Sequence, residues 1–296
     1  MDRRGFVRNL GFLAAAGGIG SLLQSCNDEL LPLTIPSRSF RILELDLRIR
    51  QKSLEQTRIF WRDFMGFTES YISMNRYQYQ VGNARLKTRT SNLPPSEEDF
   101  FFPQYHFSIS IPPNQIENCL NWFYERARLE EFQTLSFNVW KDSITGAEIV
   151  RRELYNSQSI FIEDPAGNII EILSRHNPDN PDDLVEGDFN PTMFRGITEV
   201  GCVCNDVRKV TNTLKETFQV DEVDRTSNSY KPIGGPDGLL KLTVPGKIWF
   251  PTADERAVSH DLIITVKHTE VIAPIKLSLY GDQNAFETGV WLKTEV

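Results

Sequence analysis

The chain repeats one order of apolar and polar positions at several places. Within residues 40–92, positions 43–49 alternate between apolar and charged side chains, which is typical of a strand with one buried face. An amphipathic stretch at 53–65 follows and predicts a helix. Short alternating runs then predict three strands, at 71–74, 78–81 and 84–90. This segment is therefore expected to form one strand, one helix and three strands.

Later segments repeat that order. Residues 104–175 predict a strand at 106–111, a helix at 115–128, and strands at 159–164 and 169–173 around the turn 165–168. A third copy predicts a strand at 197–204, a helix at 206–218 and a strand at 239–244. Runs at 260–266 and 275–280 indicate a shortened fourth copy. Such repeats predict an architecture built by pairing similar units.

The N-terminus has the features of an export signal. Arg3 and Arg4 precede an uncharged stretch at 10–23, which is too short to span a bilayer as a stable helix, and Leu-Gln-Ser-Cys closes it at Cys26. We interpret residues 1–25 as a signal peptide of twin-arginine type, with ordinary secretion as the alternative. Cys26 is then expected to carry the lipid, and residues 26–39 to form a polar tether. The interpretation is an exported lipoprotein, on the periplasmic face of a membrane or on the outer membrane or cell surface.

The net charge and the cysteine content argue against two further kinds of protein. The formal net charge is −8, and loss of Asp2 and of the arginines at positions 3, 4 and 8 would leave about −10. An acidic chain of this kind argues against nucleic-acid binding. Three cysteines remain after Cys26, at positions 119, 202 and 204, which is too few and too uneven for a disulfide framework.

Two motifs carry a resemblance to a known superfamily. The segment Tyr-His-Phe-Ser-Ile-Ser-Ile-Pro at 105–112 resembles a first strand that begins with a metal-binding histidine, and Asp-Pro-Ala-Gly-Asn at 164–168 leads into a strand bearing Glu171. Together with 60–66 and 246–252, they resemble the vicinal-oxygen-chelate superfamily of glyoxalases, extradiol dioxygenases and bleomycin- or fosfomycin-resistance proteins. The resemblance covers most of residues 40–266.

The resemblance implies an α+β fold of tandem βαβββ modules, with sheets that curl around a shared cavity. We expect modules 40–92 and 104–175 to pair as a first domain (40–175). A linker (176–192) and a second, partly degenerate domain (193–296) follow.

The resemblance also implies a metal site. His106, Glu171 and Asp46 would bind one divalent ion, Fe, Mn, Zn or Ni, with Glu171 also catalytic and Glu44 as the alternative to Asp46. Strand parity supports this for Glu171, whose neighbours on the same face are apolar, since a buried carboxylate is costly unless it is paired or binds a cation. Such an ion would stabilise charge that develops on chelated substrate oxygens.

The third module departs from the pattern. Glu199 occupies its histidine position and Lys241 falls near its glutamate position. Glu199 and His260 could form a weaker second site, but Lys241 would repel a cation, so a structural role is favoured there. Asp46 in place of a histidine also speaks against iron-dependent oxygen chemistry.

The leading functional hypothesis is a divalent-metal-dependent enzyme at the cell envelope that acts on a small oxygen-rich molecule. It would be a glyoxalase-like lyase or isomerase, or a ring-cleaving dioxygenase. One alternative is a non-catalytic binding or resistance-type lipoprotein that uses the same fold to hold a small molecule. Another is a structural lipoprotein that has kept the fold without the site.

Overall fold

The computed structural model of the chain describes residues 40–90, 104–176, 183–223, 227–253, 257–258, 261–268, 275–279 and 290–295. All of them belong to one compact unit, Pro32–Val296. The signal peptide (1–25), Cys26 and the tether that the sequence predicts lie outside the described residues, as does His260. Within the described part of the chain, no helix has the length and apolar content needed to cross a membrane.

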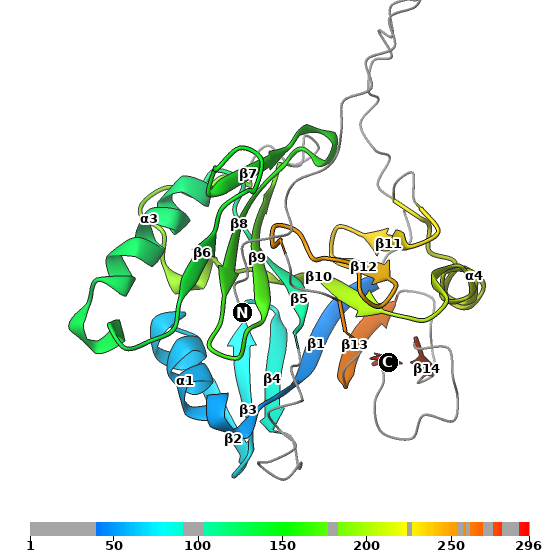
Figure 1. Ribbon diagram of the computed structural model, residues 1–296, viewed down its shortest axis with the longest axis horizontal. Helices are drawn as coiled ribbons and strands as arrows, with labels where there is room; N and C mark the ends of the chain where they lie inside the picture. The colour runs from blue at the N-terminus through cyan, green and yellow to red at the C-terminus, as the bar shows by residue number, and fades with distance from the viewer. Residues whose placement is uncertain are drawn as a thin grey trace, which may run out of the picture. The chain divides into compact units, whose positions relative to one another are not determined.

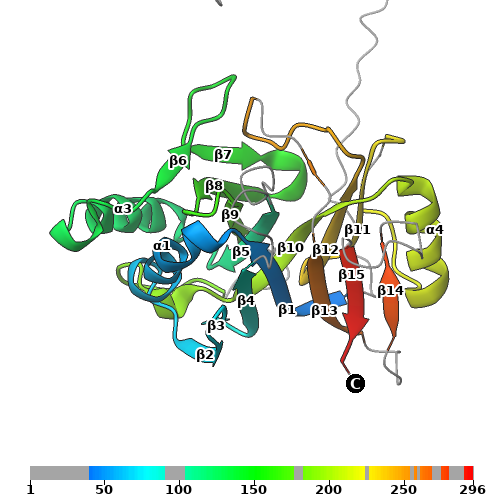
Figure 2. The same cartoon turned by 60° about the horizontal axis from the view of Figure 1, so that its bottom comes forward.

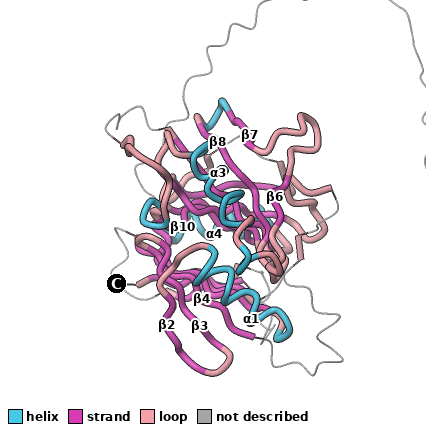
Figure 3. The backbone as a smooth tube through the Cα atoms, turned by 90° about the vertical axis from the view of Figure 1, so that its left-hand side faces the viewer, coloured by secondary structure: helices cyan, strands magenta, loops and turns pink. Residues whose placement is uncertain are grey.

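The first module contains the elements expected from its alternation. Its strands are β1 (Phe40–Ile49), β2 (Glu69–Ser73), β3 (Arg76–Val81) and β4 (Ala84–Thr90). The helix is less regular than predicted, because a 3-10 turn (Gln51–Ser53) leads into α1 (Leu54–Arg58), which continues as a π-helical segment (Ile59–Phe64). The wider turn places Phe60, Trp61 and Phe64 together in the core. Figures 1 and 3 show α1 beside β2 and β3.

The second module adds two strands that the sequence did not reveal. Its elements are β5 (His106–Ile111), α3 (Ile116–Ala127), β6 (Asn138–Trp140), β7 (Ile149–Arg152), β8 (Ser157–Glu163) and β9 (Ile169–Arg175), with 3-10 turns at Glu130–Phe132 and Glu153–Tyr155. The strand β5 has the predicted bounds. The strands β6 and β7 are short and half exposed, so their sequences carry no clear alternation.

The remaining modules are shorter. After a 3-10 turn (Pro191–Met193), the third contains β10 (Gly196–Val203), α4 (Val207–Phe218), β11 (Tyr230–Gly235) and β12 (Gly238–Thr243). The fourth contains β13 (Leu262–His268), β14 (Lys276–Ser278) and β15 (Val290–Thr294), and Figure 2 shows β15 between β13 and β14. The sequence analysis missed β11, whose Pro232 and two glycines mask its pattern, and β15.

The modules pair differently from our expectation. Sheet A has the strand order β14-β15-β13-β1-β4-β3-β2, and sheet B has β11-β12-β10-β5-β9-β8-β6, with β7 also pairing with β8. The first module therefore shares a sheet with the fourth, and the second with the third, instead of the first with the second. In each sheet the two modules join through their first strands, β1 with β13 and β5 with β10, both antiparallel. Figure 1 shows β1 (blue) beside β13 (orange).

Sheet B has one face in the main core and another that forms a small separate cluster. Alternate residues of its central strands, such as Phe107, Ile170 and Val200, belong to the main hydrophobic core. The opposite face carries a smaller cluster made of Val150, Phe161, Ile169, Val203, Trp249 and Ala257, with Trp140 and Phe250 packed against it. The polar residues that the sequence singled out in β5 and β9 lie on this second face, as the two-residue period of a strand requires.

Candidate functional site

A row of side chains crosses sheet B at one level. Strand pairing places Ser108 opposite Glu171 on one side and opposite Glu199 on the other. Phe161 lies opposite Glu171 on the next strand, and Trp140 opposite Phe161 on the one after. Residues paired in this way point to the same face of a sheet. The second and third modules therefore place polar and aromatic groups side by side on one surface.

Glu171 is a buried acid of this row and has several polar partners. Its side chain is about 5 % exposed. Ser159 Oγ donates to Oε1 at 2.7 Å, and Ser108 Oγ lies 2.8 Å from Oε2. Lys241 Nζ also donates to Oε2, at 2.8 Å. The carboxylate that the sequence predicts to need a cation therefore has one, supplied by the chain itself.

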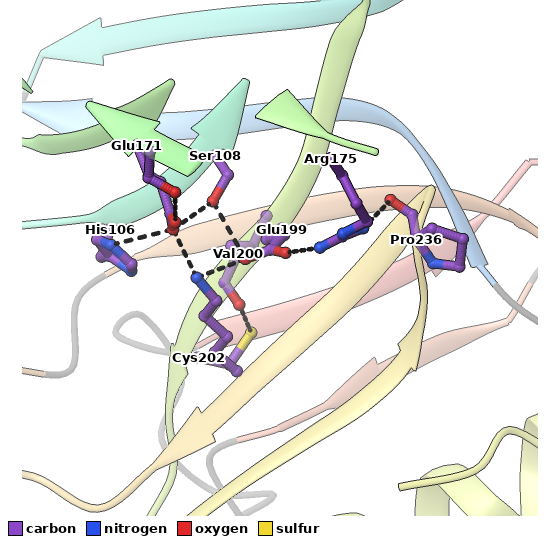
Figure 4. Close-up of polar contacts among 10 residues, drawn as sticks. His106, Ser108, Glu171, Arg175, Glu199, Val200, Cys202 and Pro236 are labelled. Atoms are coloured by element: carbon purple, nitrogen blue, oxygen red, sulfur yellow. Dashed lines mark hydrogen bonds and ion pairs between the residues drawn. The ribbon is translucent and has the colours of Figure 1, made fainter. Parts of the chain in front are cut away.

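Lys241 joins the two acids of the row. Its ammonium lies 2.5 Å from Glu199 Oε2 as well as 2.8 Å from Glu171 Oε2. The other oxygen of Glu199 accepts from Arg175, whose guanidinium also donates to the Pro236 carbonyl. Figure 4 shows Glu171, Glu199, Arg175 and Pro236 in this network on sheet B. The negative charges of Glu171 and Glu199 are thus compensated by the positive charges of Lys241 and Arg175.

His106 lies beside this network without a hydrogen bond. Its Nε2 is 3.9 Å from Glu171 Oε2, beyond hydrogen-bonding distance, and neither ring nitrogen has a partner among the described residues. The imidazole stacks on Trp249, with ring centroids 5.2 Å apart, and more distantly on Phe161. Gly201 makes room for Trp249, because a Cβ at that position would lie 2.6 Å from the indole.

Burial and charge set the protonation states. Burial, reinforced by the charge of Lys241, lowers the pKa of His106 to about 3, so the imidazole is neutral near pH 7. Burial alone would raise the pKa of Glu171, but the charge of Lys241 and the hydrogen bonds from Lys241 and Ser159 hold it well below its ordinary value. Burial would lower the pKa of Lys241, but Glu171 and Glu199 hold it well above its ordinary value. Near pH 7 the site is thus a neutral imidazole beside two carboxylates and an ammonium.

Asp46 does not join His106 and Glu171. It lies on β1 in sheet A, whereas the other two residues lie in sheet B. Its buried carboxylate forms ion pairs with Arg76 at 2.5 Å and Arg89 at 3.1 Å, so its charge is already compensated. The predicted set of three ligands is therefore reduced to His106 and Glu171, because the modules pair in a different order. Glu44, the alternative, is also in sheet A and pairs with Lys87.

The side chains at the site do not fit a divalent ion as they stand. Lys241 places a protonated amine between the two carboxylates, and an ammonium has no lone pair to ligate a metal and repels a cation. Among the described residues, no group of three or more His, Cys, Asp and Glu side chains is arranged to hold a metal ion. We therefore derive no reaction step through a metal.

Some residues of the site were not predicted as such. Arg175 follows Glu171 by four strand positions and so shares its face, a signal that the alternation could have provided. Lys241 and Glu199 were identified, but only as a structural feature of the third module. Trp249 comes from the segment after β12, and no local pattern ties it to His106.

Comparison with known proteins supports the fold alone. No protein-family profile and no curated protein sequence matches the chain. A solved structure of a Bacillus subtilis protein assigned as a dioxygenase is similar with a TM-score of 0.50 and 11% identity, over 88% of this chain and 86% of that one. Glyoxalase I from Zea mays aligns with a TM-score of 0.44 and 11% identity, over 87% of this chain and 92% of that one. The chain thus has the glyoxalase/dioxygenase-like α+β fold.

Proposed function

We propose that this chain binds a small, uncharged, oxygen-bearing molecule at the His106 face of sheet B, without a metal ion as intermediary. Of the alternatives that the sequence left open, this corresponds to the non-catalytic binding protein. The observation that carries the proposal is a set of unpartnered nitrogens on the His106 side of sheet B. The imidazole Nδ1 and Nε2 and the indole Nε1 of Trp140 and of Trp249 are all buried without a hydrogen-bond partner in the described part of the chain.

Unpartnered nitrogens are costly in a protein interior. Most buried polar groups have a hydrogen-bond partner, and each that lacks one costs about 1–3 kcal/mol. Trp249 belongs to the small cluster on sheet B, Trp140 packs against that cluster, and the His106 ring stacks on Trp249. Together they offer two indole donors and, from a neutral imidazole, one donor and one acceptor. A hydroxyl or carbonyl group of a ligand would match this set.

The charges of the site favour an uncharged ligand. Glu171 and Glu199 are compensated by Lys241 and Arg175, and His106 is neutral near pH 7. A charged ligand would bring an uncompensated charge to a buried network, which is costly. The aromatic rings of Trp249, Phe161 and Phe250 would pack against the apolar part of the ligand.

The proposal is tested by ligand binding measured at His106. In a thermal-shift screen of uncharged alcohols, ketones and lactones, we expect some compounds to raise the melting temperature of the wild type and to lose that effect in His106→Phe. In ¹H–¹⁵N spectra, the same compounds should shift the indole signals of Trp140 and Trp249. The signal of Trp291, in sheet A, serves as the internal control.

Two results would contradict the proposal. One is a screen in which every stabilising compound acts equally on wild type and His106→Phe. The other is binding that leaves both indole signals unchanged. Either result would mean that His106 has only a structural role in the core.

The proposed location is the cell envelope, and it rests on the sequence of the N-terminus. Arg3-Arg4 and the Leu-Gln-Ser-Cys motif at Cys26 support export followed by lipidation. We expect metabolic labelling with a clickable fatty acid to mark the wild type and not Cys26→Ser. Replacing Arg3 and Arg4 with lysine should block export if the route is the twin-arginine one. Continued export would instead support ordinary secretion.

A further inference from the structure

We propose that the ammonium of Lys241 is a built-in substitute for a divalent cation. Its removal would let His106, Glu171 and Glu199 Oε2 close on a metal ion, while Arg175 stays on the other oxygen of Glu199. This inference does not depend on the ligand proposed above. It concerns what neutralises the two carboxylates of sheet B.

The position of the ammonium supports the first part. Lys241 Nζ contacts one oxygen of each carboxylate, at 2.8 Å for Glu171 and 2.5 Å for Glu199. Zinc–oxygen bonds to carboxylates measure about 2.0–2.2 Å, so an ion at the position of Nζ would need Glu171 to move by about 0.7 Å and Glu199 by about 0.4 Å. Ser108 Oγ lies within 3.3 Å of the same two oxygens and holds them together from β5.

His106 supplies the third ligand. Two donor atoms on one zinc ion, each about 2.1 Å from it, can be at most about 4.2 Å apart. The 3.9 Å between His106 Nε2 and Glu171 Oε2 falls within that limit. The imidazole is about 5 % exposed, and among the described residues it has no hydrogen bond to give up. Its ring nitrogens are therefore not held by other side chains of the site.

Sheet A provides a matched control. Glu44 and Lys87 form the same kind of pair there, with 2.6 Å between Oε2 and Nζ, and Glu44 also has Arg85 at 3.1 Å. The next residue after Glu44 on the same face of β1 is Asp46, and Ile263 lies opposite it on β13. The side chain of Ile263 has no atom that could bind a metal ion. Removal of Lys87 should therefore leave no metal site, whereas removal of Lys241 should create one.

The experiment compares Co²⁺ and Zn²⁺ binding by purified full-length chains without a polyhistidine tag. After equilibration and desalting, Lys241→Ala should retain about one Co²⁺ per chain. The visible absorption bands of the bound Co²⁺ should be those of an ion with a low coordination number. Wild type and Lys87→Ala should retain less than about a tenth as much. Adding His106→Phe or Glu171→Gln to Lys241→Ala should reduce the retained metal to the wild-type level.

Stability provides a second readout, because Lys241→Ala leaves two buried carboxylates without their shared cation. Zn²⁺ should raise the melting temperature of Lys241→Ala, and of the milder Lys241→Gln, while leaving wild type unchanged. The proposal is overturned if neither variant gains metal or stability from Zn²⁺, including the case in which neither folds in its presence. Equal uptake by Lys87→Ala would overturn it as well. Each of these results leaves the proposed ligand binding at His106 intact.

Discussion

Sheets A and B are built alike and differ at two positions that matter for chemistry. In each sheet a strand with a register shift carries a glutamate directly after the shift, Glu44 in β1 and Glu199 in β10. In each, a lysine two register positions further along the neighbouring parallel strand pairs with that glutamate. The Oε2–Nζ distances are 2.6 Å for Lys87 and 2.5 Å for Lys241. The Glu–Lys pair is therefore a common feature of both halves.

The difference lies in the partner module. Ser108 and Glu171 face Glu199 in sheet B, whereas Thr265 and Lys293 hold the corresponding register positions in sheet A. Sheet B thus has a second acid where sheet A has a base. A Glu–Lys pair alone is therefore a feature of the fold that both sheets share. The candidate site arises where a second carboxylate and a histidine lie beside that pair.

We expect replacement of Lys241 to destabilise the folded chain much more than replacement of Lys87. Lys241→Ala leaves Glu171 buried without a cation, although Glu199 keeps Arg175, and should lower the free energy of unfolding by about 3–5 kcal/mol. Lys87→Ala leaves Glu44 paired with Arg85 and should cost only about 1 kcal/mol. Urea unfolding measures both. Equal losses would show that the two pairs are equivalent and that Glu171 adds nothing.

Lowering the pH should destabilise the folded chain through His106, which only sheet B has at this position. Because its folded-state pKa, about 3, lies below its ordinary 6.5, the unfolded state takes up the proton first as the pH falls. Stability is therefore lost below about pH 6.5, at up to about 1.4 kcal/mol per pH unit from this residue. Unfolding of wild type and His106→Gln should be compared between pH 6.5 and 5. Parallel profiles would mean that His106 takes up its proton in the folded chain over the same pH range as in the unfolded chain.

A smaller effect is expected at Gly201. A methyl group there would lie 2.6 Å from the Trp249 ring, and the corresponding position of sheet A holds Asp46. Gly201→Ala should cost about 1–3 kcal/mol and shift tryptophan emission to longer wavelength as the indole is displaced. The cost should shrink in a Trp249→Phe background, which can be measured as a double-mutant cycle. A full-sized cost in that background would place the clash elsewhere.

The smallest expected effect concerns one hydrogen bond. Ser159→Ala removes the donor to Glu171 Oε1 but leaves Lys241 and Ser108 on the other oxygen. The free energy of unfolding should fall by about 1 kcal/mol. A loss as large as that of Lys241→Ala would show that serine, and not the ammonium, holds the carboxylate in place.

The sequence predicted local structure better than module pairing. Alternation placed β1, β5 and β10 within a few residues. His106 and Glu171, which the family resemblance brought together, lie 3.9 Å apart on one face of sheet B. It could not show that β5 pairs with β10 and not with β1, because strand pairing depends on contacts between residues far apart in the chain. The prediction that Asp46 lies beside His106 rested on a pairing of the first two modules that differs from the observed one. The parity argument for Glu171 was sound, but the cation that compensates it is Lys241.

In sheet B an ammonium, and not a metal ion, neutralises Glu171 and Glu199. Elemental analysis of the full-length chain, purified without added metal or chelator, can establish this in one measurement. We expect less than about 0.1 equivalent of Fe, Mn, Ni or Zn. About one equivalent that disappears in both His106→Ala and Glu171→Ala would show that a metal ion occupies the site.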